Sequence, residues 1–336
     1  VRPVGSTPSL GDPLVDEYLR FTAARVRANT LTAQAFDLKV FFTVVPKAPQ
    51  QVTVTDVLLF IEAQRAPRRG GNVIRLADGE AGLAASTIKR RLATVSSLFD
   101  YLFLRGICDR NPVPRSLGAR HARPDGRGHG GRRGAPLVRA PRKLPRVLAP
   151  AEVGALTGAL RTDRDRAMVA LMVHGGLRRC EVLGLRFEHV QVGDRRVFVA
   201  DGKGGHQRLV PVADIFFTNL ASYLSRERPA EAVDDHVFVV LKGPNRGRPL
   251  TAAGLDEVMA GARGRAGLSH ASCHELRHTC FTRLREAGMA LEAIQAQAGH
   301  ASIETTRVYL HLSNDWLAGE YQRAMAILDG LHEEEP

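Results

Sequence analysis

Cysteines are few in this sequence, and none forms a pair typical of a metal site or a disulfide framework. Among 336 residues the cysteines are Cys108, Cys180, Cys273 and Cys280, with no CxxC spacing. The sequence therefore indicates neither a cysteine zinc site nor a small disulfide-rich domain. Because free thiols fit a reducing compartment, we expect the protein to be cytoplasmic.

Long apolar runs are also missing. No stretch approaches the ~18 uninterrupted apolar residues of a membrane-crossing helix, and residues 1–6 lack the apolar core of a secretory signal. We therefore expect no membrane partner. The hydrophobic share of 44% is that of a folded chain. At roughly 100–200 residues per domain, the length predicts about two domains.

Positive charge is in excess and is concentrated in one segment. The net charge is +12 and the pI is near 10.2, which exceeds the value of about 9 that indicates nucleic-acid binding. Residues 115–146 hold ten basic side chains and one acid, Asp125, and are rich in Gly and Pro. Such a composition cannot bury enough apolar surface to form a core.

We expect residues 116–146 to be a basic linker that lies against nucleic-acid phosphates and gains affinity by counterion release. A solvated spacer is the alternative. The arginines that we expect to contact the nucleic acid are Arg120, Arg123, Arg127, Arg132 and Arg133.

Before this linker, apolar residues recur at three- and four-residue spacing in successive stretches, which predicts helices. The predicted helix starts are Asp12, Thr30, Thr53 and Ser86. Gly106 and Asn111-Pro112 end the last stretch. We expect a helical bundle over residues 8–115.

After the linker the pattern is mixed. Helical spacing is found over residues 151–160, 165–173 and 178–185, and again from Leu255 onward. Two short β-type runs, 196–200 and 208–212, flank a glycine-rich turn and predict a hairpin, and 237–241 is a candidate further strand. We expect residues 147–334 to form a mainly α domain with a small antiparallel sheet.

Several side chains in this second region suit chemistry on a phosphate. Arg178 and Arg277 carry guanidinium groups able to hold the oxygens of one phosphate by paired hydrogen bonds. His274 and Arg277 are three residues apart, so they share a face of a helix. Lys203, in the hairpin turn, is placed to reach a leaving oxygen.

Tyr309 offers a hydroxyl nucleophile. Because its free pKa is about 10, it needs a base and a positive site to ionise near neutrality. No paired carboxylates or His-rich cage suited to a two-metal nuclease are found in the sequence, so cationic side chains would carry the transition-state charge. We expect no cofactor and no metal.

Simpler explanations exist for each residue alone. Arg178 and Glu181 suit a surface ion pair, Lys203 a solvated charge, and Tyr309 a half-buried core position. Residues 274–278 also match H-E-x-x-H, the helical zinc motif of metalloproteases.

We disfavour the zinc protease, because Glu286 interrupts the metzincin continuation and Arg277 would add positive charge beside the metal. Glu292 and Glu304 are the remaining third-ligand candidates.

Taken together and in this order, the clusters resemble the tyrosine recombinase (phage integrase) family. Residues 274–279 match its H-x-L-R-H-T box, and Gly176-Leu177-Arg178 with Glu181 matches its first arginine box. The other matching boxes are Gly202-Lys203-Gly204 followed by Arg208 and Pro211, Gly299-His300, and residues 305–309. The helical bundle is similar to the family's core-binding, SAM-like domain. Ala298 departs from the family's usual leucine, and the basic linker is unusually long.

The resemblance implies a site-specific recombinase or integrase that works through a 3′-phosphotyrosine, without ATP or an obligatory metal. In this reading Tyr309 attacks a DNA phosphate. The roles implied for the other residues are phosphoryl-oxygen binding by Arg178, Arg277 and His300, protonation of the leaving 5′ oxygen by Lys203, and proton transfer with Tyr309 by His274. Glu181 and His278 would support them.

The resemblance also implies double-stranded DNA as the partner, and a homotetramer or heterotetramer on two DNA sites in a bacterial cytoplasm, bound to the nucleoid through DNA. The resemblance does not distinguish between phage, transposon, integron and chromosome-resolution systems. The final helix would dock on a neighbouring subunit or pack on its own domain through Trp316, Leu317, Tyr321, Met325 and Leu328. A type IB-like topoisomerase and a catalytically idle DNA-binding protein are the alternatives.

Overall fold

A computed structural model describes most of the chain, in two compact units. The described residues are 7–66, 82–114, 137–139, 145–200, 202, 207–232, 234–299, 306 and 325. The units are Val1–Arg142 and Lys143–Pro336. Within the described residues, no helix combines the length and the apolar character needed to span a bilayer.

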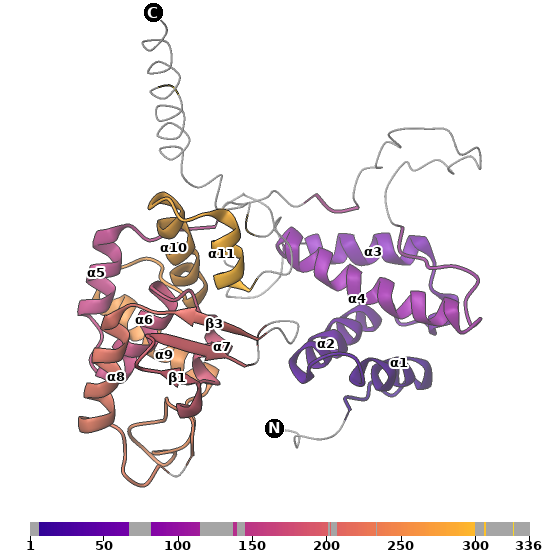
Figure 1. Ribbon diagram of the computed structural model, residues 1–336. Coiled ribbons are helices and arrows are strands. Elements are labelled where there is room, and N and C mark those ends of the chain that lie inside the picture. The colour runs from indigo at the N-terminus through magenta and orange to yellow at the C-terminus, as the bar shows by residue number, and fades with distance from the viewer. Residues whose placement is uncertain are drawn as a thin grey trace, which may run out of the picture. The chain divides into compact units, whose positions relative to one another are not determined.

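The first unit is helical, as predicted (Figure 1). Its described elements are α1 (Pro13–Ala23), α2 (Ala28–Val44), the 3-10 turn η1 (Pro49–Gln51), α3 (Val54–Arg65) and α4 (Ala85–Leu104). Asp12 caps α1 by accepting hydrogen bonds from the first-turn N–H groups, and Thr53 forms a capping box with Asp56 at α3. The other two predicted starts, Thr30 and Ser86, lie inside the first turns of α2 and α4, which lack a side-chain cap.

A buried carboxylate joins two helices of this unit. Asp37 of α2 is fully buried and accepts hydrogen bonds from Arg90 and Thr94 of α4, with Arg91 at 3.7 Å. A buried charge is tolerated only when it is paired in this way. The pairing therefore fixes the register of α2 against α4 beside an aromatic core.

Part of the predicted linker packs on the first unit. Leu137 and Val138 line a shallow pocket of about 180 Å³ together with Leu92 and Val113, and Val138 is 4% exposed. The apolar contact is with the same core that α4 contributes to. Leu137 and Val138 thus belong to the core of the first unit, which ends at Arg142.

The second unit combines helices with a small antiparallel sheet, which confirms the expected fold class. Its described helices are α5 (Pro150–Gly158), α6 (Asp163–Val173), α7 (Arg179–Leu183), η2 (Phe187–His189), α8 (Asp214–Arg226), α9 (Ala252–Arg265), α10 (Cys273–Glu286) and α11 (Leu291–Ala298). The described sheet has the order β1 (Val190–Gln191), β2 (Arg196–Val199), β3 (Arg208–Pro211), with Val197 opposite Val210. The predicted hairpin corresponds to β2 and β3, while β1 was not predicted.

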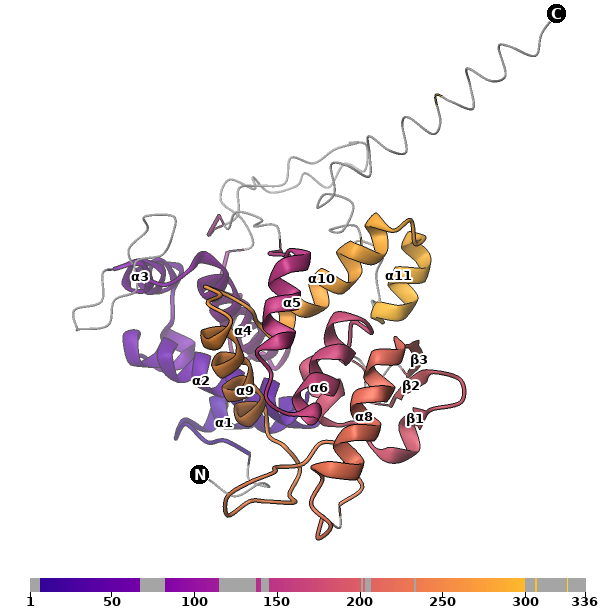
Figure 2. The same ribbon diagram turned by 90° about the vertical axis from the view of Figure 1, so that its left-hand side faces the viewer.

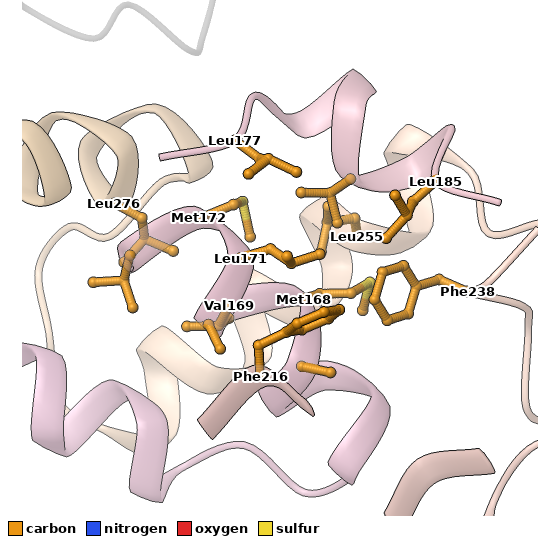
Figure 3. Packing of buried hydrophobic residues seen from close by; sticks show 14 of the residues in the cluster. Met168, Val169, Leu171, Met172, Leu177, Leu185, Phe216, Phe238, Leu255 and Leu276 are labelled. Carbon is orange, nitrogen blue, oxygen red and sulfur yellow. The ribbon is translucent and has the colours of Figure 1, made fainter. Parts of the chain in front are cut away.

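Helix α6 forms the centre of the second unit. Every residue from Ala167 to Val173 is buried, so this apolar part of the helix is covered on all sides. Figure 3 shows Met168 and Phe216 near Phe238, and Met172 between Leu177 and Leu276. Leu177 and Leu276 neighbour Arg178 and Arg277 in sequence, so the core directly supports the segments that carry the arginines.

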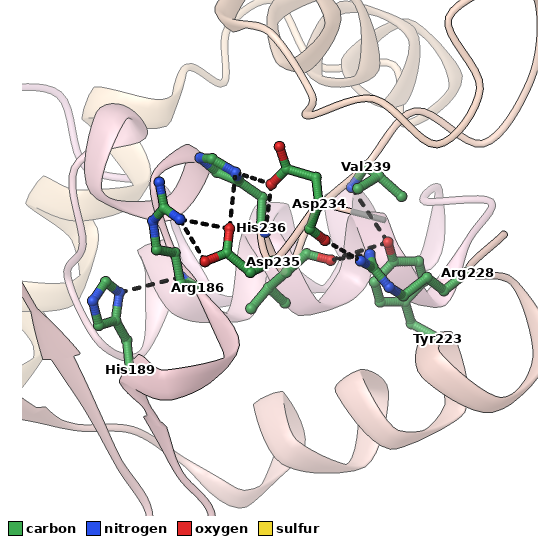
Figure 4. Close-up of polar contacts among 9 residues, drawn as sticks. Arg186, His189, Tyr223, Arg228, Asp234, Asp235, His236 and Val239 are labelled. Atoms are coloured by element: carbon green, nitrogen blue, oxygen red, sulfur yellow. Dashed lines mark hydrogen bonds and ion pairs between the residues drawn. The ribbon is translucent and has the colours of Figure 1, made fainter. Parts of the chain in front are cut away.

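The candidate strand over residues 237–241 does not form. The structure has only isolated bridges here, Val239 with Pro249 and Arg186 with His236. The apolar run reflects burial, because Val237 and Val239 are fully enclosed. Their backbone groups are satisfied in part by the Tyr223 hydroxyl, which donates to the Val237 carbonyl at 3.1 Å and accepts from the Val239 N–H at 3.3 Å (Figure 4).

Candidate functional site

Arg277 lies in the middle of α10 and connects two other segments. The side chain is buried, with the residue 3% exposed. Its guanidinium donates to the carbonyl of Gly176, before α7, and to the carbonyl of Ala298 at 2.7 Å, at the end of α11. It also lies 4.8 Å from the ring centre of Phe281, a cation–π distance. Arg277 is therefore fixed in position by contacts on several sides.

Gly176 has the backbone conformation that this contact requires. Its φ is +67°, and a Cβ added there would lie 2.4 Å from the ring of Phe281. Only glycine avoids both the left-handed strain and the overlap. The glycine of the Gly176-Leu177-Arg178 box thus lets the chain approach the aromatic ring beneath Arg277.

Arg178 is the N-cap residue of α7, and its side chain is 21% exposed. Its guanidinium donates to Glu181 Oε1 at 2.8 Å, and its backbone N–H donates to Glu181 Oε2 at 2.8 Å. A second guanidinium nitrogen lies 3.5 Å from the carbonyl oxygen of Gly299. Arg178 and Arg277 therefore contact the carbonyls of two successive residues, Gly299 and Ala298, at the end of α11.

The Glu181 side chain is completely buried between two arginines. Besides Arg178, it accepts two hydrogen bonds from Arg208 of β3, at 3.0 and 2.8 Å. Burial by itself would raise the pKa of the Glu181 carboxyl, but the hydrogen bonds from Arg208 and Arg178 outweigh it and hold the pKa below its usual value. Glu181 is thus a carboxylate at neutral pH, and the three groups together carry one net positive charge.

His274 and His278 form a pair on successive turns of α10. Their Nε2 atoms are 2.9 Å apart and their rings meet edge to face, so one ring donates a hydrogen bond to the other. Burial and the positive charges of Arg277 and Arg178 lower the pKa of His274, although much of the residue is open to solvent. Burial, followed by the effects of His274 and Arg277, lowers the pKa of His278 to about 4. Both rings are neutral at pH 7.

The structure brings Arg178, Glu181 and Arg277 together around the end of α11, and His274 lies three residues before Arg277 on α10. Figures 1 and 2 show α10, α11 and β3 as neighbours. Other predicted site residues lie outside the described residues: Lys203, His300, Tyr309 and the linker arginines Arg120, Arg123, Arg127, Arg132 and Arg133. Gly299 directly precedes His300. In the box ending at Tyr309, Thr306 is described and buried.

Two residues at this site, Arg208 and Gln297, had no role predicted from the sequence, although Arg208 belongs to the matched hairpin box. Arg208 donates from Nε to the Gln297 carbonyl at 2.8 Å, and the Gln297 side-chain amide donates to the Gly175 carbonyl at 3.4 Å. A signal for Arg208 was present. It lies two residues before Val210 in a strand, so it shares a face with a buried valine, where an arginine needs a partner.

The zinc hypothesis gains no third ligand from the described residues. Glu275 accepts from the Ser272 N–H at 2.7 Å and caps α10. Glu304 is not described. Among the described side chains, a group of three or more metal-ligand types converges only at Asp234, Asp235 and His236, on the loop in Figure 4. There Arg186 holds Asp235 and Asp234 contacts His236, so these donors already have partners.

Comparison with known proteins identifies relatives over nearly the whole chain. A model of the phage integrase family matches residues 146–315. Tyrosine recombinase XerC of Serratia marcescens is 28% identical over 322 residues, covering 94% of this chain and 95% of that protein. The XerC of Yersinia pestis is 31% identical over 249 residues, covering 73% and 74%.

A solved structure shares the fold. The Tn1549 transposon integrase in complex with circular intermediate DNA has a TM-score of 0.67 at 17% identity, and the match covers 92% of this chain and 97% of that one.

Proposed function

Since the chain belongs to the phage integrase family and is a tyrosine recombinase, we propose that it cuts and rejoins DNA at specific sites through a 3′-phosphotyrosine. The observation that carries this proposal is the position of two guanidinium groups. Arg178 and Arg277 come from segments about a hundred residues apart, yet they contact successive carbonyls next to His300. Two fixed arginines that contact the two residues before a histidine in the sequence suit the binding of a single phosphate.

In the proposed reaction the Tyr309 oxygen attacks the phosphorus and the bond to the 5′ oxygen breaks. His274 accepts the tyrosine proton, which requires a neutral imidazole, and the lowered pKa of His274 supplies one at pH 7. Lys203 gives a proton to the leaving 5′ oxygen. Attack of a 5′ hydroxyl on the phosphotyrosine then rejoins a strand and frees Tyr309, so no ATP and no metal enter any step.

Arg178, Arg277 and His300 bind the phosphoryl oxygens in this proposal. Glu181 holds Arg178, and His278 holds His274 by the contact between their Nε2 atoms. The helical first unit and the linker arginines bind double-stranded DNA in the bacterial cytoplasm. A homotetramer or heterotetramer on two DNA sites carries out the exchange of strands.

The nucleophile is tested by covalent capture. The probe is a pool of randomised DNA duplexes, each with a single nick that lets the cleaved end diffuse away. The wild-type protein should become covalently attached to selected duplexes, which are recovered under denaturing conditions and sequenced. Tyr309→Phe should bind DNA with similar affinity and form no covalent product. Attachment by the Phe variant would overturn the assignment of Tyr309.

The same capture separates this proposal from a topoisomerase. A recombinase should yield a defined sequence among the captured duplexes. A type IB-like topoisomerase should yield no preferred sequence and should relax any supercoiled plasmid.

A further inference from the structure

Arg208 is an arginine on the buried side of the hairpin, five residues after Lys203. Its side chain is 9% exposed, while that of Arg178 is 21% exposed and that of Glu181 is fully enclosed. The side chain of Arg208 is thus largely buried next to Glu181, and that of Arg178 is the more exposed to solvent of the two arginines. Because each of its three guanidinium nitrogens donates to Glu181 or to the Gln297 carbonyl, Arg208 acts through its neighbours.

The contacts of Arg208 join three elements of the second unit. Two guanidinium nitrogens donate to the two oxygens of Glu181 on α7, and Nε donates to the Gln297 carbonyl on α11. The planar guanidinium alone has the donors to make these bonds at once. Since Arg208 itself stands on β3, one side chain ties the hairpin strand that follows Lys203 to the helix end that precedes His300.

The fit is close at Gly299. This residue ends α11 with a φ of +60°, and a Cβ added there would lie 3.1 Å from the Arg208 guanidinium. Arg208 therefore occupies the space that a side chain at 299 would need. The backbone conformation at Gly299, immediately before His300 in the sequence, therefore depends on the Arg208 side chain that packs against it.

The charge balance gives Arg208 a second effect. A carboxylate 2.8 Å from the Arg178 guanidinium opposes the attraction of that group for a phosphate. With Arg208 also bonded to Glu181, the three side chains Arg178, Glu181 and Arg208 carry one net positive charge. Without Arg208, the charges of Glu181 and Arg178 would cancel. Removing Arg208 therefore weakens the positive field at Arg178 without touching Arg178 itself.

We propose that Arg208 is a positioning residue of the recombinase: it balances Glu181 so that Arg178 remains cationic toward the DNA phosphate, and it fixes the end of α11 that leads to His300. This inference rests on the proposed function, because it concerns the phosphate of the same reaction. It adds a role for a residue that contacts no reacting atom.

The test compares single-turnover formation of the covalent complex on a nicked duplex recovered by the capture above. Arg208→Gln should lower this rate roughly 100-fold, comparable to the loss of a transition-state donor, with little change in DNA affinity. Arg208→Lys keeps the charge and loses the planar guanidinium with its several donors, so it should lower the rate roughly 10-fold. The matched control is Arg186→Gln, which removes one charge from an exposed Arg–Asp pair and should leave the rate unchanged.

A rescue experiment separates charge balance from simple support of the fold. In the Arg208→Gln background, Glu181→Gln removes the unbalanced carboxylate and should recover roughly 10-fold of the lost rate. A second loss of rate on adding Glu181→Gln, or an Arg208→Gln rate equal to wild type, would overturn the proposal. Thermal unfolding of each variant establishes the folded fraction to which the rates are referred.

A measurement on the free protein makes the inference independent of catalysis. Carbon-13 NMR titration of the glutamate carboxyls should show the pKa of Glu181 higher in Arg208→Lys than in wild type, and higher still in Arg208→Gln if that variant folds. An unchanged Glu181 pKa would overturn the charge balance. Failure of the wild-type protein to form any covalent complex would instead overturn the proposed function, and the titration would still decide the role of Arg208.

Discussion

Thr279 ties the start of the second unit to the helix that carries Arg277. Its hydroxyl accepts a hydrogen bond from the backbone N–H of Leu148 at 2.9 Å and donates to the Glu275 carbonyl at 2.8 Å. Thr279 is fully buried and Leu148 is 1% exposed. The threonine of the matched H-x-L-R-H-T box therefore anchors the chain where it enters the second unit. Thr279 has no role in the proposed reaction.

Thr279→Val should destabilise the protein by about 1–3 kcal/mol, because it leaves the buried Leu148 N–H without an acceptor. Urea unfolding followed by circular dichroism measures the change. Thr279→Ser keeps the hydroxyl and loses one methyl group, so it should retain more stability than the valine variant. Equal stability of wild type and Thr279→Val would show that the hydrogen bond has no net effect.

The pair of His274 and His278 should make stability depend on pH. The folded-state pKa of His278 is about 4, below the value of 6.5 expected for an unperturbed histidine. The unfolded chain therefore binds more protons between these values, so stability is complete above pH 6.5 and is lost as the pH falls toward 4. Allowing for partial exposure, the loss is about 1–2 kcal/mol.

Urea unfolding at pH 7 and pH 5 measures this dependence. The decrease in unfolding free energy should be smaller in His278→Gln than in wild type, since the variant lacks the titrating ring. The difference between the two proteins isolates His278 from other histidines, including His174, whose pKa is also lowered by burial. Parallel curves would contradict the prediction.

Gly176→Ala should destabilise the protein by roughly 2–4 kcal/mol, because it combines a left-handed φ with overlap on the Phe281 ring. It should also lower the cleavage rate, since that ring and the Gly176 carbonyl both contact Arg277. The control is Gly158→Ala at the end of α5, where an added Cβ meets nothing within 4 Å. Thermal unfolding of both variants gives the comparison, and similar midpoints would refute it.

Replacing the linker arginines with glutamine should weaken binding to all DNA sequences alike. Each lost phosphate contact should reduce the slope of log K against log salt by about 0.9. Binding titrations at several KCl concentrations measure the slope for the combined replacement of Arg120, Arg123, Arg127, Arg132 and Arg133. An unchanged slope would leave the linker as a spacer, and Arg186→Gln controls for the loss of surface charge in general.

The local elements were predictable because they depend on neighbours in sequence. Asp12 and Thr53 cap helices as expected, and the two β-type runs form the predicted hairpin. Periodicity failed at 237–241, where an apolar run whose first three residues are buried resembles a strand without forming a ladder. Strand β1, only two residues long, is too short to give any pattern.

The site was predictable in its composition and not in its contacts. Arg178 and Arg277 were identified by residue type and order, but their contacts with Gly299 and Ala298 depend on how α11 packs against α10 and β3. Bonds between residues about 90 to 120 positions apart, such as Arg208 with Gln297, leave no trace in local spacing. Two clues to Arg208 were available, its place in the matched hairpin box and the alternation that puts it on the buried side of β3.

The burial of Val138 decides how the protein should be divided for study of its parts. A fragment that stops at residue 115 would lack Val138, and Leu92 and Val113 would then be exposed to solvent where Val138 covers them. A fragment that ends at Arg142 keeps the contact of Val138 with Leu92 and Val113. It also keeps all the linker arginines that are predicted to contact DNA. The amino-terminal half expressed alone would then carry the entire net charge of the chain, +12.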